Sequence, residues 1–95
     1  MFNFLRRAEV LSKQAQYSKM ESFTHLVEEV GEVGTCLNVE VTGRKQLNES
    51  TLVECVDVVN CALELFFKSG GTIEEFINMM QIKQDKWEKN LAKII

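Results

Sequence analysis

The sequence predicts an all-α fold in which four helices form a bundle that oligomerisation completes. Apolar residues recur at helical intervals, no proline interrupts them, and Gly43 and the pair Gly70 and Gly71 supply helix ends. With 95 residues, 45% hydrophobic and 26% charged, the chain is expected to form one domain over residues 1–95. A chain of this length buries only about two thirds of its unfolded surface, so self-association would stabilise it.

The first two helices are predicted from apolar spacing and from capping residues. The first, roughly residues 2–16, is short and amphipathic. Ser18 and Glu21 have the spacing of a capping box, which predicts a second helix that runs to residue 41 or 42 and ends near Gly43. A polar connection over residues 43–50 follows.

The third helix is expected over about residues 51–69, and Gly70 and Gly71 end it. Thr72 and Glu75 form a second capping-box pair, which opens a fourth helix toward the C terminus. Most positions of the third helix are apolar, so we expect it to be buried nearly all round. Its polar residues form one strip, namely Glu54, Asp57, Asn60, Glu64 and Lys68.

The second helix carries an apolar stripe that is expected to face the core, formed by Leu26, Val30, Val33 and Leu37. Glu29 and Glu32 flank this stripe, and their three-residue spacing brings their side chains close together. Gly31 and Gly34 each cost the helix up to about 1 kcal/mol relative to alanine. We expect these glycines to permit the close approach of a neighbouring helix.

Glu54 and Asp57 repeat the spacing of Glu29 and Glu32 on a helix that is otherwise apolar. A buried, unpaired carboxylate costs several kcal/mol, so two acidic pairs on facing helices favour bound cations. Carboxylate oxygens suit Mg²⁺ or Mn²⁺. Two plainer interpretations stay open: E-E-x-x-E occurs on many solvated helices, and Thr51 has capping-box spacing to Glu54.

Composition excludes several other classes of protein. A formal net charge of -3 argues against binding to a nucleic-acid polymer. Residues 1–10 lack the long apolar run of a signal peptide, and the richest apolar run is too short and too acidic to span a bilayer. The three cysteines are Cys36, Cys55 and Cys61, and none of them has C-x-x-C spacing to another. An odd number without that spacing indicates reduced core residues, and reduced cysteines favour a location in the cytoplasm.

Two acidic motifs, E-E-x-x-E at residues 28–32 and E-x-x-D at residues 54–57, are separated by 21 residues. DVVNCALEL at residues 57–65 and KWEKN at residues 86–90 accompany them. This pattern resembles the MazG-like all-α nucleoside triphosphate pyrophosphohydrolases, and the resemblance runs from about residue 26 to residue 90.

The resemblance implies hydrolysis of (deoxy)nucleoside triphosphates between the α- and β-phosphates, which yields the monophosphate and pyrophosphate. The implied role is housecleaning, that is, the removal of canonical or altered nucleotides from the nucleotide pool. It implies a homodimer or homotetramer that requires Mg²⁺, with Mn²⁺ as an alternative. The implied metal ligands are Glu29, Glu32, Glu54 and Asp57. Glu28 and Glu29 are the candidate catalytic residues, and the candidate substrate-binding residues are Asn60, Lys83, Lys86, Lys89 and Asn90.

Two other functions stay open. One is a non-catalytic helical oligomerisation module with structural cation binding. The other is a phosphoribosyl-ATP pyrophosphohydrolase-like enzyme, although that group tends to carry a Tyr-His or similar pair after the E-x-x-D aspartate, where this chain has Val58, Val59 and Asn60. The sequence does not choose among several candidates for a base pocket, which are Asn60, Phe2, Phe4, Tyr17 and Trp87.

Overall fold

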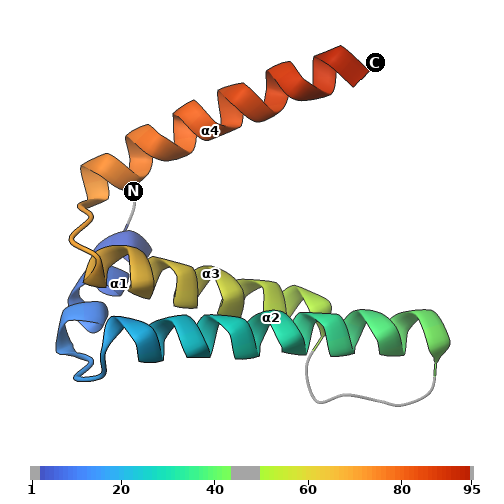
Figure 1. Cartoon of the computed structure of the whole chain (residues 1–95), viewed down its shortest axis with the longest axis horizontal. Coiled ribbons are helices and arrows are strands. Elements are labelled where there is room, and N and C mark those ends of the chain that lie inside the picture. The colour runs from blue at the N-terminus through green and yellow to red at the C-terminus, as the bar shows by residue number, and fades with distance from the viewer. Residues whose placement is uncertain (1–2, 44–49, 95) are drawn as a thin grey trace.

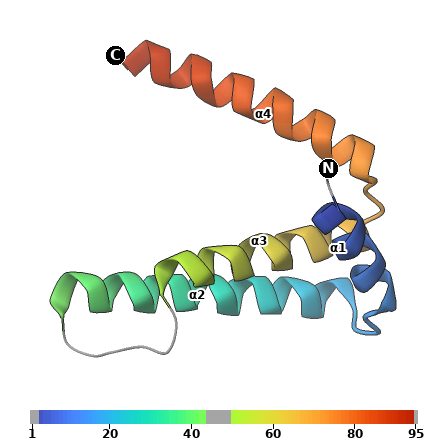
Figure 2. The same ribbon diagram turned by 180° about the vertical axis from the view of Figure 1, so that it is seen from behind.

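The computed structural model describes residues 3–43 and 50–94, which form four α-helices and, within these ranges, no strand. The helices are α1 (Asn3–Gln14), α2 (Lys19–Thr42), α3 (Thr51–Lys68) and α4 (Ile73–Ile94). The long helices α2 and α3 lie side by side and antiparallel, α1 lies at one end of this pair, and α4 projects away from it (Figures 1 and 2). The all-α prediction is confirmed.

The predicted helix ends agree with the structure wherever a local capping signal exists. Ser18 accepts a hydrogen bond from the backbone N–H of Glu21 at 3.1 Å, and the Glu21 carboxylate accepts one from the Ser18 N–H at 3.2 Å. Thr72 and Glu75 exchange the same two bonds, both at 3.1 Å. Gly43 closes α2 in the left-handed conformation, with φ 65°. Phe2 and residues 44–49 lie outside the described ranges.

At the start of α3 the cap is Ser50 rather than Thr51. The Ser50 hydroxyl accepts a hydrogen bond from the Val53 N–H at 3.3 Å, whereas the Thr51 hydroxyl donates to the Glu40 carboxylate of α2. The interpretation of Glu54 as the partner in a Thr51 capping box is therefore wrong.

The two glycines after α3 serve different purposes. Gly70 adopts a positive φ of 95°, which a residue with a side chain adopts only with strain. A Cβ on Gly71 would lie 2.3 Å from the ring of Phe66, so any side chain at this turn would have to displace that ring. Together they let the chain reverse sharply between α3 and α4.

The apolar core lies where α1, the end of α3 and the start of α4 meet. Leu5, Leu63 and Phe67 are buried there, and the side chains that pack against them include Ala8, Phe66, Ile73, Phe76 and Ile77. The ring of Phe66 makes edge-to-face contacts with Phe67 and Phe76 at centroid distances of 5.5 and 5.3 Å. This core ties α1 and α4 to one end of α3.

Polar contacts fix the connection between α1 and α2 on the same end of α3. The Glu64 carboxylate accepts hydrogen bonds from the hydroxyls of Tyr17 at 2.7 Å and Ser22 at 2.6 Å. The Lys68 ammonium donates to the carbonyls of Ala15 and Tyr17 and lies 4.4 Å from the centroid of the Tyr17 ring. The last two residues of the predicted polar strip therefore position α1.

Two predictions of burial are wrong for the described chain. On α3, Leu52 is 80% exposed and Val56 is 58% exposed, although we expected this helix to be covered nearly all round. On α2, Val30 and Leu37 of the predicted stripe are about half exposed, while Ser22 and Cys36 are buried instead. One chain supplies too few neighbouring helices to cover both apolar surfaces.

The reason proposed for the glycines of α2 also fails within the described chain. A Cβ on Gly31 or Gly34 would meet no atom within 4 Å, so no helix of this chain approaches them closely. The prediction for the cysteines holds only in part, because Cys36 is buried, Cys61 is half-buried and Cys55 is exposed. All three are free thiols.

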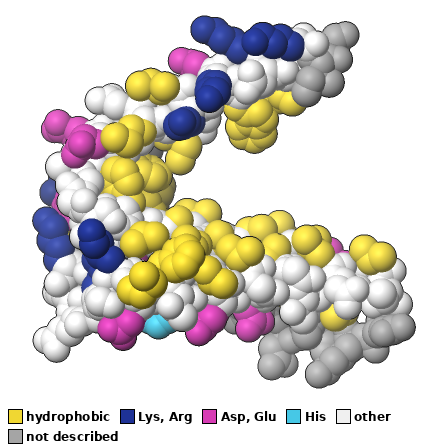
Figure 3. All heavy atoms as spheres, in the orientation of Figure 1, with side chains coloured by type: hydrophobic (Ala, Val, Ile, Leu, Met, Phe, Trp, Pro, Cys, Tyr) yellow, Lys and Arg dark blue, Asp and Glu magenta, His cyan; other side chains and the backbone are white. Residues whose placement is uncertain are grey.

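Helix α4 leaves the rest of the chain after its first turns, and every residue from Asn78 to Lys93 is exposed. Hydrophobic side chains gather on the facing sides of α4 and of the α2–α3 pair, which leaves an open hollow between them (Figure 3). The radius of gyration is 15.9 Å, whereas a compact chain of this length would have about 12 Å. No helix in the described ranges combines the length and apolar character that a bilayer crossing requires.

Candidate metal centre

Three acidic residues from two helices meet between α2 and α3. Glu29 of α2 and Glu54 and Asp57 of α3 each offer a carboxylate oxygen, and these oxygens all lie within 4.8 Å of one another. The two α3 residues are one helical turn apart, and the antiparallel packing of the helices brings Glu29 to them. Glu29 thereby joins two residues that lie 25 and 28 positions further along the chain.

The chemistry of this cluster fits a hard divalent cation. Its donors are carboxylate oxygens, and opposite ligands of an Mg²⁺ ion lie about 4 Å apart, so small side-chain rotations would close the site. Glu54 is only 6% exposed, and Glu29 and Asp57 are half-buried. Among the described residues, neither Glu29 nor Asp57 forms an ion pair with a lysine or arginine, so a cation would relieve their mutual repulsion.

Glu32 and Glu28 lie outside this cluster. Both are exposed on α2, and the side of α2 that faces α3 is centred near Glu29. Of the four predicted metal ligands, the structure thus brings three together and leaves Glu32 about 60° around the helix from Glu29. Glu28 is open to solvent beside the cluster.

The predicted substrate-binding residues fall into two groups. Asn60 lies one turn beyond Asp57 on α3 and lines a cavity between α1 and α3. The others are exposed on α4, namely Lys83, Lys86, Lys89 and Asn90. The described backbone of α4 approaches α1 but not α2, so within one chain these four residues do not reach the acidic cluster. Trp87, a base-pocket candidate, is 64% exposed on the same helix.

The cavity beside Asn60 has a volume of about 450 Å³, which is within the usual range for small-molecule sites. Phe4 and Tyr17, both candidates for a base pocket, contribute to its wall, and so do Arg7 and Glu64. The sequence gives no sign of a role for Arg7, because that role depends on how α1 crosses α3. No local sequence pattern encodes this crossing.

The thiol of Cys61 lies near the acidic cluster, one turn after Asp57. Burial raises the pKa of this thiol, and the carboxylates of Glu29, Glu64 and Asp57 raise it further. The protonated thiol is therefore favoured near pH 7, which makes it a poor nucleophile. The ligand atoms that converge at this site are the carboxylate oxygens of Glu29, Glu54 and Asp57.

Comparisons of the chain with models of protein families, with curated proteins and with solved structures found no match. The functional assignment therefore depends on the residues and their geometry.

The hydrogen bond between Tyr17 and Glu64 predicts an unusual titration. The bond to the Glu64 carboxylate is the main reason why the pKa of Tyr17 is raised to about 12, above its usual value of 10. Because the protonated hydroxyl is favoured in the folded chain, this contribution to stability is complete below pH 10 and is lost between pH 10 and about 12.

Tyr17 is the single tyrosine, so absorbance at the tyrosinate band follows it alone as the pH is raised. Glu64→Gln should return the pKa toward 10, and circular dichroism at each pH verifies that the helices persist. A folded wild-type chain that titrates near pH 10 would contradict the role of Glu64.

Proposed function

We propose that the protein is a small Mg²⁺-dependent pyrophosphohydrolase of (deoxy)nucleoside triphosphates. The observation that carries this proposal is the convergence of Glu29, Glu54 and Asp57 from two helices on one point. The spacing of the acidic motifs, which resembles that of the MazG-like enzymes, supports the same reaction. Hydrolysis between the α- and β-phosphates would release pyrophosphate and the nucleoside monophosphate, and the cytoplasm is the predicted location.

Each residue near the cluster has a role that its position supports. Glu54 is buried between the helices, so it is held rigidly, while the half-buried Glu29 and Asp57 can adjust around an ion. When bound there, Mg²⁺ (or Mn²⁺) supplies positive charge for the phosphate oxygens and makes a water molecule more acidic. Glu28, which is exposed beside Glu29, is suited to accept the proton of the attacking water.

Assembly into a homodimer or homotetramer is part of the proposal. Exposed apolar side chains on α3 and α4 leave a surface that a second copy of the chain would cover. The cations of α4 join a substrate site only if assembly brings them to the acidic cluster of another chain. Lysines on that helix would then contact phosphate oxygens that the metal leaves uncovered.

A panel of common nucleoside and deoxynucleoside triphosphates tests the reaction. We expect the purified protein to release pyrophosphate from at least one of them with Mg²⁺ or Mn²⁺ and to release none after chelation with EDTA. Detection of pyrophosphate and of the monophosphate together distinguishes this cleavage from the release of inorganic phosphate. If no nucleotide of the panel yields pyrophosphate with either ion, the proposed function is wrong.

A non-catalytic oligomerisation module is the second candidate, and the exposed apolar surface of α3 and α4 favours it. Such a module would assemble and would bind a cation, yet it would hydrolyse nothing. Assembly and Mn²⁺ binding without pyrophosphate release from any nucleotide would therefore select it.

A further inference from the structure

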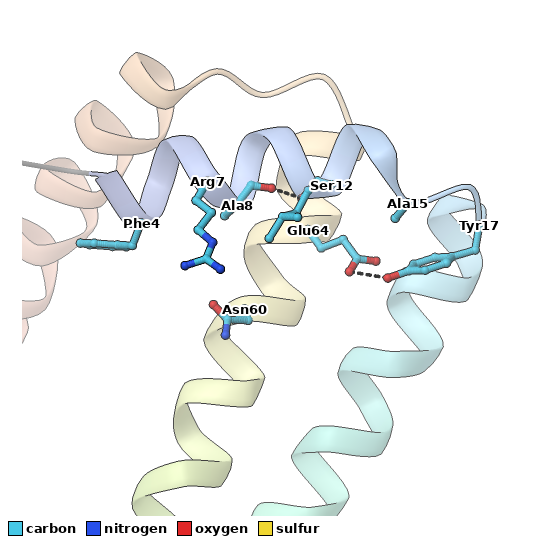
Figure 4. Close-up of a pocket in the computed structure, with 9 residues that line it drawn as sticks. Phe4, Arg7, Ala8, Ser12, Ala15, Tyr17, Asn60 and Glu64 are labelled. Atoms are coloured by element: carbon cyan, nitrogen blue, oxygen red, sulfur yellow. Dashed lines mark hydrogen bonds between the residues drawn. The ribbon is translucent and has the colours of Figure 1, made fainter.

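The cavity between α1 and α3 is built from both polar and apolar side chains. In Figure 4 the guanidinium of Arg7 extends from α1 toward the amide of Asn60 on α3, while Phe4 and Tyr17 lie toward opposite ends of α1. The polar wall near Tyr17 is completed by Glu64. This combination of aromatic rings and a few converging polar groups is typical of sites for small organic ligands.

We propose that this cavity binds the base of the nucleotide and that Arg7 is a specificity-determining residue, which donates hydrogen bonds to a base that presents two adjacent acceptors. Guanine, with its O6 and N7 atoms, is such a base, whereas adenine has an amino donor, N6, beside its N7 acceptor. This inference rests on the proposed function, because it assumes that the substrate is a nucleotide.

The position of the cavity agrees with a nucleotide whose phosphates lie at the acidic cluster. Asn60 follows Asp57 by three residues, which corresponds to a rise of about 4.5 Å along α3. The acidic cluster and the cavity therefore adjoin one another on the polar strip of one helix. A ligand with anionic phosphates at one end and a ring at the other matches this order.

The hydrogen-bonding capacity of the cavity selects for acceptors on the ligand. Both carboxylate oxygens of Glu64 already accept hydrogen bonds, from Tyr17 and Ser22, and the Ser12 hydroxyl donates to the Ala8 carbonyl at 2.6 Å. Within residues 3–43 and 50–94, the Arg7 guanidinium makes no hydrogen bond or ion pair, so its donors are available. A planar guanidinium binds two adjacent acceptors at once.

The apolar part of the wall suits a flat ring. Phe4 and Leu11 border the cavity, and Tyr17 lines its other end, where Lys68 lies over the ring and Glu64 holds the hydroxyl. Bases stack on aromatic side chains without regard to their identity. Stacking of the base on aromatic rings therefore contributes affinity for any nucleotide. Hydrogen bonds from Arg7 and Asn60 determine which base is preferred.

Isothermal titration of the full chain with GMP and AMP, without metal, tests this inference. We expect GMP to bind more tightly than AMP. Arg7→Ala should weaken GMP binding by about 10-fold or more and bring it near that of AMP. Arg7→Lys keeps the charge but loses the planar fork, so it should lose most of the selectivity as well.

Arg6→Ala is the matched control, because Arg6 is exposed on the same helix but does not line the cavity. It should leave GMP binding unchanged. The inference is overturned if Arg7→Ala binds GMP as the wild type does, or if Arg6→Ala loses as much. It is also overturned if Arg7→Ala weakens GMP, AMP and pyrophosphate equally, because Arg7 would then be a phosphate contact.

The titration requires no turnover, so it succeeds or fails separately from the proposed reaction. Pyrophosphate release with an unchanged KM for GTP in Arg7→Ala would overturn only the role of Arg7. Selective GMP binding without pyrophosphate release would overturn only the reaction.

Discussion

Asp57→Asn is expected to abolish Mg²⁺-dependent pyrophosphate release, lowering kcat/KM by about 100-fold or more. Asparagine keeps the shape of the side chain but removes the negative charge that a hard cation requires. Glu54→Gln should have the same effect, because Glu54 is the buried member of the cluster. Steady-state kinetics of pyrophosphate release and the electron paramagnetic resonance of bound Mn²⁺ measure the two consequences separately.

Two further variants make this test specific. Glu74→Gln removes an acidic side chain that is exposed at the start of α4, outside the cluster, and should leave kcat/KM unchanged. Glu32→Gln decides whether the site has three or four protein ligands, since Glu32 belongs to the acidic motif but lies outside the observed cluster. If Asp57→Asn retains wild-type activity and Mn²⁺ binding, the assignment of the metal centre is wrong.

If the chain forms the proposed homo-oligomer, Val59→Glu is expected to favour monomers. Val59 lies on an apolar groove of about 330 Å³ among α1, α3 and α4, together with Phe76, Ile77 and Met80. A carboxylate buried in an interface costs several kcal/mol, so the dissociation constant should rise by about 100-fold or more. Sedimentation velocity at several protein concentrations measures the distribution of monomers and oligomers.

Gln14→Glu introduces the same charge at an exposed polar position of α1 and should leave the assembly intact. Circular dichroism separates a loss of assembly from a loss of helices. A wild-type chain that sediments as a folded monomer at every concentration would show that the apolar surface has no self-association role.

The helices were predictable because their signals are local. Ser18 with Glu21 and Thr72 with Glu75 satisfy backbone groups within a single turn, so their effect does not depend on the rest of the fold. The start of α3 at Thr51 was also predicted, but one interpretation gave the capping role to Thr51 in place of Ser50. Ser50 and Thr51 are adjacent and both residue types cap helices, and only the contact between Thr51 and Glu40 separates their roles.

The candidate site was predicted in part, and the remaining difference is one of helix rotation. Sequence spacing placed Glu29 with Glu54 and Asp57, which the structure confirms as neighbours. The apolar pattern of α2 predicted that the stripe around Val30 faces the core. In the structure, the side of α2 that packs on α3 is centred about 70° away, near Glu29. Contacts between helices determine how α2 is rotated about its axis. An apolar residue that would pack against a second chain cannot be distinguished in the sequence from a core residue.

The position of the apolar core relative to the acidic cluster has a consequence for the dynamics of α3. Leu63 and Phe67 anchor the C-terminal half of this helix in the core, whereas Glu54 and Asp57 lie in its N-terminal half. In the acidic half Leu52, Val53 and Val56 are exposed, so few apolar contacts oppose the repulsion among the carboxylates. We expect local opening of α3 to start there. A cation that bound only the closed form would stabilise the acidic half of α3 against this opening. Substrate binding through the cation would then be coupled to the local order of the helix.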